Sequence, residues 1–258
     1  LCDFEVIYKS SKCFLNYNNN KITIKYSTGS YLKFKNILYE LEEITIHTPS
    51  LHSIDNQKYD LEICLIHSLG GNNPNSNGVM LCILFEAGPN FGGPEQFINQ
   101  IINEIPSENI DYDKEIIVSE DWGANMLIPE NKSFFMYDGS LHYPPCTQGY
   151  TVFVYETINK LGRHNLDTFK QFLGKNIRKI QPLNNRTVFY KAKNIDSNKN
   201  SPKISISDNK YLKCRKVLVP PKKVVDSNTT TQSDVSSYGI NEKTKKQLWN
   251  WFIVITIL

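Results

Sequence analysis

The sequence predicts a mixed α+β domain built from strands and short helices. Of its 258 residues, 40% are apolar and 12% are aromatic, which is typical of a chain with a sizeable buried core. Residues 44–47 are rich in β-branched side chains, which favour strands. Both this segment and residues 58–67 show the two-residue alternation of a strand. Glu95–Asn103 and Asn165–Phe172 repeat apolar side chains at helical spacing and predict two helices.

Four blocks of sequence, in this order, resemble conserved blocks of the α-carbonic anhydrase family. Residues 43–52 (Glu-Ile-Thr-Ile-His-Thr-Pro-Ser-Leu-His) resemble F-H-F-H-T-P-S-E-H, and residues 61–67 (Leu-Glu-Ile-Cys-Leu-Ile-His) resemble E-x-H-L-V-H. Residues 134–149 resemble Y-Y-x-Y-x-G-S-L-T-T-P-P-C-x-E-G, and residues 176–186 resemble N-x-R-x-x-Q-P-L-N-x-R. The resemblance implies a mainly β fold, a central, twisted, largely antiparallel sheet with short peripheral helices.

The resemblance also implies a zinc ion held by three histidines, only one of which is retained. His47 stands at one ligand position, whereas Thr45 and Cys64 stand at the other two. Strand alternation still presents all three side chains to one cavity. A threonine hydroxyl is a poor zinc ligand, and a cysteine thiolate opposes the ionisation of zinc-bound water that hydration of CO₂ requires. The spacing of the site is therefore kept while its ligand set is not.

Other positions that catalysis uses in the family are also replaced. Ser30 stands where a histidine shuttles protons, and its hydroxyl cannot exchange protons near neutral pH. His142, followed by Tyr143, stands where a threonine orients the zinc-bound hydroxide. Leu51 stands where a glutamate accepts that threonine's proton, and leucine accepts nothing. We interpret the cavity as metal-free and plugged by His142 and Tyr143.

The remaining polar positions are interpreted as parts of the core. Glu62 matches the carboxylate that orients the third zinc-bound histidine, but Cys64 has no imidazole N–H to offer it. His52 and His67 are likewise expected to be satisfied core groups. The resemblance places the walls of a CO₂ slot at four positions, one of which, Tyr150, replaces a valine and adds bulk: Ile66, Met80, Leu141 and Tyr150.

An alternative assignment keeps a metal in the cavity. His142 replaces the residue nearest the ion, so its imidazole would complete a three-ligand set with His47 and Cys64. Two histidines and one cysteine are an acceptable zinc set. Zinc is therefore the one cofactor that this alternative admits, whereas the plugged cavity holds none.

Three hypotheses on function follow. In the first, the chain is a catalytically inactive carbonic anhydrase-related protein, a membrane-attached binding or structural module with a protein or glycan partner. In the second, it is a divergent zinc enzyme that hydrates CO₂ to bicarbonate with the ligands His47, Cys64 and His142. In the third, exposed thiols store metal or exchange electrons.

The chain divides by charge near residue 190. Residues 1–190 carry 16 basic and 21 acidic side chains, a net charge of −5, and the rest carry 13 and 5, a net charge of +8. We expect a carbonic anhydrase-like domain over 1–190 that lacks the family's opening Q-S-P-I segment, and a basic linker over 191–247. Residues 211–220 could add a strand. The composition favours a solvated linker over nucleic-acid binding.

Residues 248–258 are almost wholly apolar but too few to span a membrane alone. Small residues and a polar stretch precede them, as in a glycolipid-anchor signal, and a truncated membrane helix fits nearly as well. We therefore expect membrane attachment in the secretory pathway or at a cell or organelle surface. Asn-x-Ser/Thr triplets at Asn131, Asn185 and Asn228 would permit glycosylation there.

The cysteines are not spaced as a zinc finger. The resemblance implies a partner for Cys146 upstream of the chain's first block, and Cys2 and Cys13 are the two candidates to replace it. Spacing does not decide between them. The six cysteines are Cys2, Cys13, Cys64, Cys82, Cys146 and Cys214.

Overall fold

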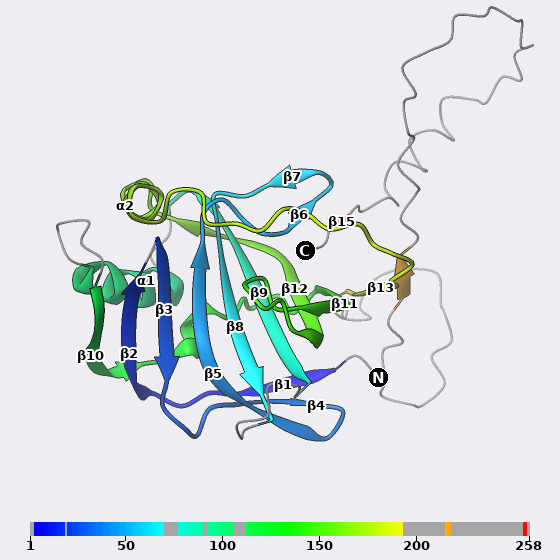
Figure 1. The fold of residues 1–258 in the computed structure, drawn as a ribbon, viewed down its shortest axis with the longest axis horizontal. Helices are drawn as coiled ribbons and strands as arrows, with labels where there is room; N and C mark the ends of the chain where they lie inside the picture. The colour runs from blue at the N-terminus through cyan, green and yellow to red at the C-terminus, as the bar shows by residue number, and fades with distance from the viewer. Residues whose placement is uncertain are drawn as a thin grey trace, which may run out of the picture.

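A curled sheet of twelve strands runs through the domain in the computed structural model, which describes residues 3–18, 20–69, 77–89, 92–105, 112–192, 215–217 and 255–256 (Figure 1). The strand order is β10-β2-β3-β5-β8-β9-β12-β11-β13-β14, while β4 pairs with both β1 and β5. The strands of this sheet are β1 (Phe4–Ile7), β2 (Ser11–Asn18), β3 (Lys21–Tyr26), β4 (Tyr31–Phe34), β5 (Ile37–His47), β8 (Leu61–Ser68), β9 (Gly78–Ala87), β10 (Tyr112–Trp122), β11 (Phe134–Ser140), β12 (Gln148–Leu161), β13 (Val188–Lys191) and β14 (Arg215–Val217).

Neighbouring strands of this sheet are antiparallel except β9 and β12, which run parallel. The predicted largely antiparallel sheet is therefore confirmed. Its centre is formed by β5, β8 and β9, and every residue of β8 is buried. A strand buried on both faces is expected to be apolar throughout, so the polar side chains that β8 does carry need partners inside the protein.

The predicted strand over residues 58–67 begins later than expected. Lys58 belongs instead to β7 (Gln57–Lys58), which pairs with β6 (Ser53–Ile54) in a short hairpin. The hairpin turns at Asp55 and Asn56, whose φ values of 51° and 63° are those of a two-residue turn with a left-handed backbone. The chain then enters β8 at Leu61. The hairpin turn at Asp55 and Asn56 therefore separates Lys58 from the strand that was predicted to include it.

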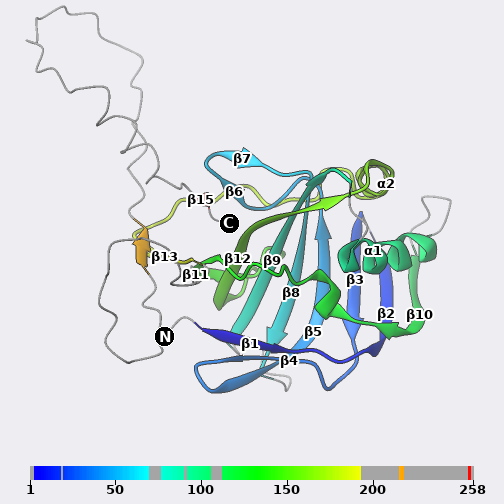
Figure 2. The ribbon, with the colours of Figure 1, turned by 180° about the vertical axis from the view of Figure 1, so that it is seen from behind.

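The two predicted helices are confirmed as α1 (Gly93–Glu104) and α2 (Arg163–Leu173). Both lie at the end of the sheet that contains β10, β2 and β3 (Figures 1 and 2). Their apolar faces, which include Phe97 and Phe169, join the larger of two buried clusters. A short 3₁₀ helix, Ala124–Leu127, also contributes to that cluster.

The sheet separates this larger cluster from a second one on its opposite face. Along β8, Ile63 and Leu65 belong to the larger cluster, while Cys64 and Ile66 belong to the second. The two-residue period of a strand explains this division. The second cluster is the one that surrounds the candidate site.

The C-terminal part of the chain is described at two short segments. Arg215–Val217 form β14, which pairs with β13, so the strand expected within residues 211–220 is present. Ile255–Thr256 form β15, which pairs with β6. The rest of the predicted linker beyond Ala192 and of the predicted membrane-attaching segment lies outside the described residues. Among the helices that the structure does describe, none is long and apolar enough to cross a membrane.

Gly78, at the start of β9, is predicted to be intolerant of a side chain. A Cβ atom there would lie 2.3 Å from Cε1 of Tyr150 and 2.7 Å from the carbonyl oxygen of His67. We expect Gly78→Ala to lower the free energy of unfolding by about 1–3 kcal/mol, as overpacking does. Urea denaturation measures the change.

Two further variants test the reason for the loss. Adding Tyr150→Val to Gly78→Ala should recover only part of the stability, because the backbone oxygen cannot move away. Gly88→Ala is the matched control, since its nearest atoms belong to the flexible stem of Lys160. Equal losses at the two glycines would contradict the prediction.

Candidate functional site

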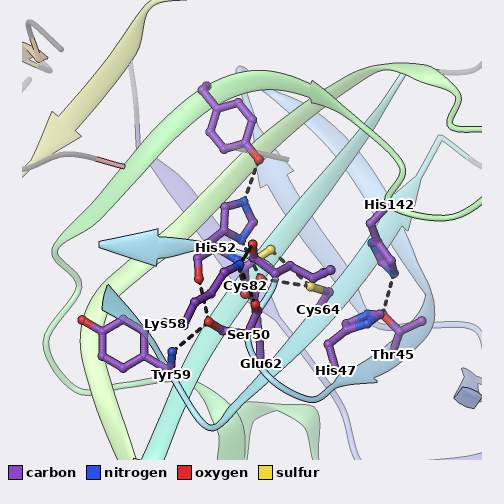
Figure 3. Close-up of polar contacts among 12 residues, drawn as sticks. Thr45, His47, Ser50, His52, Lys58, Tyr59, Glu62, Cys64, Cys82 and His142 are labelled. Atoms are coloured by element: carbon purple, nitrogen blue, oxygen red, sulfur yellow. Dashed lines mark hydrogen bonds and ion pairs between the residues drawn. The ribbon is translucent and has the colours of Figure 1, made fainter. Parts of the chain in front are cut away.

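The candidate site lies on the face of the sheet formed by the ends of β5 and β8. Register pairs Thr45 with Cys64 and His47 with Glu62, so these side chains meet on one face as predicted. His142 comes from the loop after β11 and points toward Thr45 (Figure 3). Arg178 holds this loop by donating hydrogen bonds to the Ser140 hydroxyl and the Leu141 carbonyl.

A chain of hydrogen bonds joins the residues that replace the zinc ligands. The Oγ1 atom of Thr45 lies 2.9 Å from Nε2 of His47 and 3.2 Å from Nε2 of His142. On its other side, Nδ1 of His47 lies 3.3 Å from the carbonyl oxygen of Asn176. A carbonyl only accepts, so His47 carries its proton on Nδ1 and its Nε2 accepts from the Thr45 hydroxyl. Thr45 Oγ1 then accepts from the Nε2–H of His142.

This arrangement leaves one buried nitrogen alone. With its proton on Nε2, His142 has a lone pair on Nδ1, and that atom has no hydrogen-bond partner in the described part of the chain. His142 is 7% exposed and His47 3%, so water does not reach either ring freely. The two rings pack edge to face with centroids 4.3 Å apart.

Burial keeps both imidazoles neutral. It lowers the pKa of His47 to about 4, against the opposing charge of Glu62, and it lowers the pKa of His142 well below the usual value. Burial also raises the pKa of the Cys64 thiol, and the neighbouring Cys82 raises it further. At neutral pH the site therefore holds two uncharged rings, one hydroxyl and one thiol.

Three of these side chains could hold a metal ion. One ligand atom each from His47, Cys64 and His142 lies within 4.8 Å of the others, so the alternative ligand set foreseen from the sequence is brought together. Two imidazoles and a thiol are ligands that zinc accepts. If zinc bound both Nε2 atoms, His142 would have to move its proton to its unpartnered Nδ1, and the hydrogen bonds to Thr45 would break.

A second polar cluster lies next to the first and is centred on Glu62, which is paired with His47 across the sheet. Nδ1 of His52 lies 2.6 Å from Oε1 of Glu62, and Nε2 of His52 lies 2.7 Å from the Tyr137 hydroxyl. The backbone N–H of His52 donates to the other carboxylate oxygen of Glu62 at 2.8 Å. Glu62 thus orients His52. The resemblance implies that a carboxylate at this position would instead orient a zinc-bound histidine.

This cluster holds a buried ion pair. Burial by itself would raise the pKa of Glu62, but the charge and hydrogen bonds of His52 outweigh it and lower the pKa to about 2. The same partnership outweighs burial at His52 and raises its pKa well above 6.5. His52 is therefore a cation and Glu62 an anion at neutral pH, and the pair is neutral overall.

His67 belongs to neither cluster. It faces the other side of β8, where its Nε2 lies 2.7 Å from the Tyr8 hydroxyl and its Nδ1 lies 3.1 Å from the Val79 carbonyl. Burial lowers its pKa to about 4. The structure gives it partners inside the core and places it away from the candidate metal ligands.

The other positions singled out from the sequence are buried, apart from Tyr143, which is half-buried. Ser30 is 1% exposed, and its hydroxyl accepts a hydrogen bond from the Lys9 backbone at 3.0 Å. The Tyr143 ring lies against His142 and under Lys21, whose Nζ is 4.1 Å from the ring centroid. The expected slot residues belong to the same buried cluster as Cys64 and pack together with Leu51: Ile66, Met80, Leu141 and Tyr150.

An open hollow of about 520 Å³ lies elsewhere, lined by Lys58, Tyr59, Lys170 and their neighbours. It contains none of the candidate ligands. Lys58 at its wall donates to the carbonyls of Ser50 and Leu51, which secures the loop after β5.

Three contributors to the site were not foreseen. Cys82 lies directly opposite Cys64 on β9, with the two Sγ atoms 3.4 Å apart, and Tyr137 and Asn176 supply partners to His52 and His47. Alternation within β9 puts Cys82 on one face, but only the register between strands shows which residue it meets.

The expectation of exposed thiols is wrong for most of the described cysteines. Cys13, Cys64 and Cys82 are fully buried, whereas Cys146 is partly exposed. Cys13 and Cys146 are both free thiols, so they do not pair with each other. Cys2 lies outside the described residues.

The curled sheet and the paired strands at its centre define an α-carbonic anhydrase-like protein. The model of the eukaryotic-type carbonic anhydrase family matches residues 2–192. The chain therefore belongs to this family, and the resemblance seen in the sequence is confirmed.

Relatives within the family carry more than one name. A carbonic anhydrase of a Nostoc species is 30% identical over 190 residues, and the match covers 70% of this chain and 65% of that protein. Dioscorin DB3L of Dioscorea polystachya is 26% identical over 209 residues, covering 74% of this chain and 73% of that one. The chain thus spans just under two thirds of the length of the Nostoc relative.

Solved structures agree on the fold. Carbonic anhydrase Cah3 of Chlamydomonas reinhardtii, solved in complex with acetazolamide, superposes with a TM-score of 0.64 at 27% identity, over 73% of this chain and 81% of that one. A dioscorin complexed with ascorbate superposes with a TM-score of 0.60 at 24% identity, over 75% and 79%.

The neutral buried histidines predict a loss of stability in mild acid. The pKa of His67 is about 4 in the folded chain and 6.5 in the unfolded chain, so between these values only the unfolded chain gains the proton. Stability is therefore complete above pH 6.5 and falls as the pH drops towards 4, by about 3 kcal/mol for this histidine. His47, with the same shift, acts in the same direction.

Urea denaturation at a series of pH values measures this dependence. The ion pair of His52 and Glu62 contributes only at the acid end of the window, since the depressed pKa of Glu62 acts below 4.5 and the raised pKa of His52 acts above 6.5. His67→Gln should make the dependence shallower by about one proton. A free energy of unfolding that stays constant from pH 6.5 to pH 4 would contradict the prediction.

The bridging hydroxyl predicts a further loss of stability. Thr45→Val removes the partner of both Nε2 atoms, which leaves two buried polar atoms unpaired and should destabilise the folded chain by about 1–3 kcal/mol. Thr23→Val is the matched control. Thr23 pairs with Thr45 across the sheet, is buried, and makes no side-chain hydrogen bond within the described residues. Equal effects of the two substitutions would refute a bridging role.

Proposed function

We propose that this chain is a catalytically inactive carbonic anhydrase-related protein that acts as a binding or structural module. The observation that carries the proposal is the Thr45 hydroxyl, which bridges His47 and His142 at the position of a lost zinc ligand. The bridge uses both Nε2 atoms without an ion, and it leaves Nδ1 of His142 as the one ring nitrogen of the two histidines without a partner among the described residues. While the bridge is formed, neither Nε2 atom is free to bind zinc.

The chemistry of CO₂ hydration supports the proposal. The reaction requires a hydroxide on zinc near neutral pH, which three neutral imidazoles provide by lowering the pKa of the bound water to about 7. In this chain a thiol stands among the ligands, and a thiolate there would raise the pKa of the water again. His142 stands where a threonine would orient the hydroxide, and its ring fills the adjoining space against Tyr143.

The walls of the cavity favour the same conclusion. Leu51 accepts no proton, Ser30 is bonded to the backbone of Lys9, and Tyr150 packs into the cluster where CO₂ would lodge. Each replacement by itself would slow turnover. Together they replace the groups that would pass on the proton released by hydration.

The proposal extends to where the module is attached and to the kind of partner that it binds. We infer attachment to a membrane through residues 248–258, in the secretory pathway or at a cell or organelle surface, and a protein or glycan as partner. The support for attachment is the apolar composition of those residues. The acidic charge of residues 1–190 argues for a partner other than an acidic glycan on that part of the chain.

The second candidate is a divergent zinc-dependent carbonic anhydrase. The observation that favours it is the convergence of His47, Cys64 and His142, whose ligand atoms lie within 4.8 Å of one another. In this case His47 and His142 would hold the ion as neutral imidazoles and Cys64 would hold it as a thiolate. Bound zinc would supply the hydroxide for attack on CO₂.

Zinc content and CO₂ hydration, measured on one sample of the full chain, decide between the two. We expect no stoichiometric zinc and no rate above the uncatalysed reaction, because the bridged histidines do not release their nitrogens. The measurements are mass spectrometry for metal and stopped-flow spectrophotometry for hydration. One zinc per chain that is lost in both His47→Ala and His142→Ala, together with turnover, would establish the enzyme instead.

A restored variant is the positive control. Thr45→His combined with Cys64→His and His142→Thr returns the three imidazoles and the threonine of the family to their positions. We expect this variant to bind zinc stoichiometrically, since strand register already directs the first two side chains to one point. Zinc binding by the restored variant alone would show that the replaced ligands, and not the scaffold, keep the natural chain metal-free.

A further inference from the structure

Two thiols lie side by side beneath the candidate site. Cys64 on β8 and Cys82 on β9 are directly paired residues, and their Sγ atoms are 3.4 Å apart. Both side chains are fully buried and both are free. A tetrahedral zinc ion, with metal–sulfur bonds of about 2.3 Å, separates two sulfur ligands by about 3.8 Å, and the larger cadmium ion separates them slightly more. Each sulfur therefore needs to move only by tenths of an ångström to bind one ion.

The imidazoles near this pair are engaged with other partners. A ligand nitrogen of His47 lies within 4.8 Å of Cys64 Sγ, but its Nε2 accepts a hydrogen bond from the Thr45 hydroxyl and its Nδ1–H faces the Asn176 carbonyl. Glu62 and Tyr137 occupy both ring nitrogens of His52. The two sulfurs are therefore the ligands that the structure offers to an ion at this point.

The balance of charge favours two sulfur ligands over one. Glu62 is already neutralised by His52, so among the described residues around the pair no carboxylate is left to compensate an ion. A divalent ion with one thiolate would leave a net positive charge within a buried, mostly apolar cluster. With two thiolates the charge is zero, which removes the larger part of the burial penalty.

We propose that Cys64 and Cys82 form a dithiolate binding site for a divalent, thiolate-preferring ion of the cadmium(II) class. This site is distinct from the His47, Cys64 and His142 set, because it requires Cys82. Soft thiolate ligands favour soft ions over the harder ones that imidazole and water accept. Binding breaks two S–H bonds, forms two sulfur–metal bonds and releases two protons to solvent.

The proposal stands independently of the proposed lack of catalysis. Two thiolates on an ion raise the pKa of any bound water, so the site would not restore hydration of CO₂. Zinc content and turnover test the proposed function, whereas sulfur coordination of cadmium tests the dithiol site. Each can fail without the other.

Cadmium chloride titrated into the reduced full chain tests the proposal. We expect one ion per chain, a thiolate-to-cadmium charge-transfer absorption in the ultraviolet, and two sulfur neighbours by X-ray absorption spectroscopy. Cys82→Ser should weaken cadmium binding at least about tenfold. Losing a residue that only hydrogen-bonds a metal ligand already costs that much, and losing the ligand itself costs more. Cys13→Ser and Cys146→Ser, at a buried thiol outside the cavity and a partly exposed one, should leave binding unchanged.

Several results would overturn the proposal. One sulfur neighbour or none in the unmodified chain would do so, and this measurement does not depend on whether any variant folds. Binding that survives Cys82→Ser and Cys82→Ala but is lost in Cys146→Ser would show that cadmium binds the surface thiol. Unchanged binding in all variants, with near-ultraviolet circular dichroism showing folded chains, would mean that the two cysteines serve only as packing.

Discussion

The pairing of β5 with β8 at the centre of the sheet places Thr45 opposite Cys64 and His47 opposite Glu62, and the rest of the site is arranged around these two pairs. Every residue of β8 is buried, so each polar group on it must find a partner within the protein. Glu62 finds His52, and Thr45 joins His47 to His142. The site is thus organised first by the demand for hydrogen bonds in a dry interior.

That demand explains how a scaffold built to hold an ion remains folded when its ligands change. A three-histidine site without its ion would leave several buried nitrogens unpaired, each at a cost of about 1–3 kcal/mol. In this chain a hydroxyl stands at one former ligand position and pairs with two nitrogens at once. His142 Nδ1 is the exception. The same replacements therefore also stabilise the fold in the absence of an ion.

The buried thiols connect the two clusters. Cys64 lies within reach of His47 and His142 on one side, and it lies 3.4 Å from both Cys82 Sγ and a Glu62 oxygen on the other (Figure 3). Burial favours the protonated thiol, whereas a divalent ion would favour the thiolate. Binding of an ion is therefore coupled to deprotonation of these two thiols. Both events change the charge that lies within the surrounding apolar cluster.

The sequence by itself determined the family, the two helices, the strands that carry the site and the identity of the replaced ligands. These follow from local patterns: two-residue alternation, helical spacing and ordered motifs of adjacent residues. It did not determine that β8 begins at Leu61, that Thr45 bridges two histidines, or that Cys82 meets Cys64. The two contacts depend on the register between strands and on the loop after β11, which lies far from β5 in the sequence. Alternation names the face on which a side chain lies, and only the packed sheet decides its neighbour.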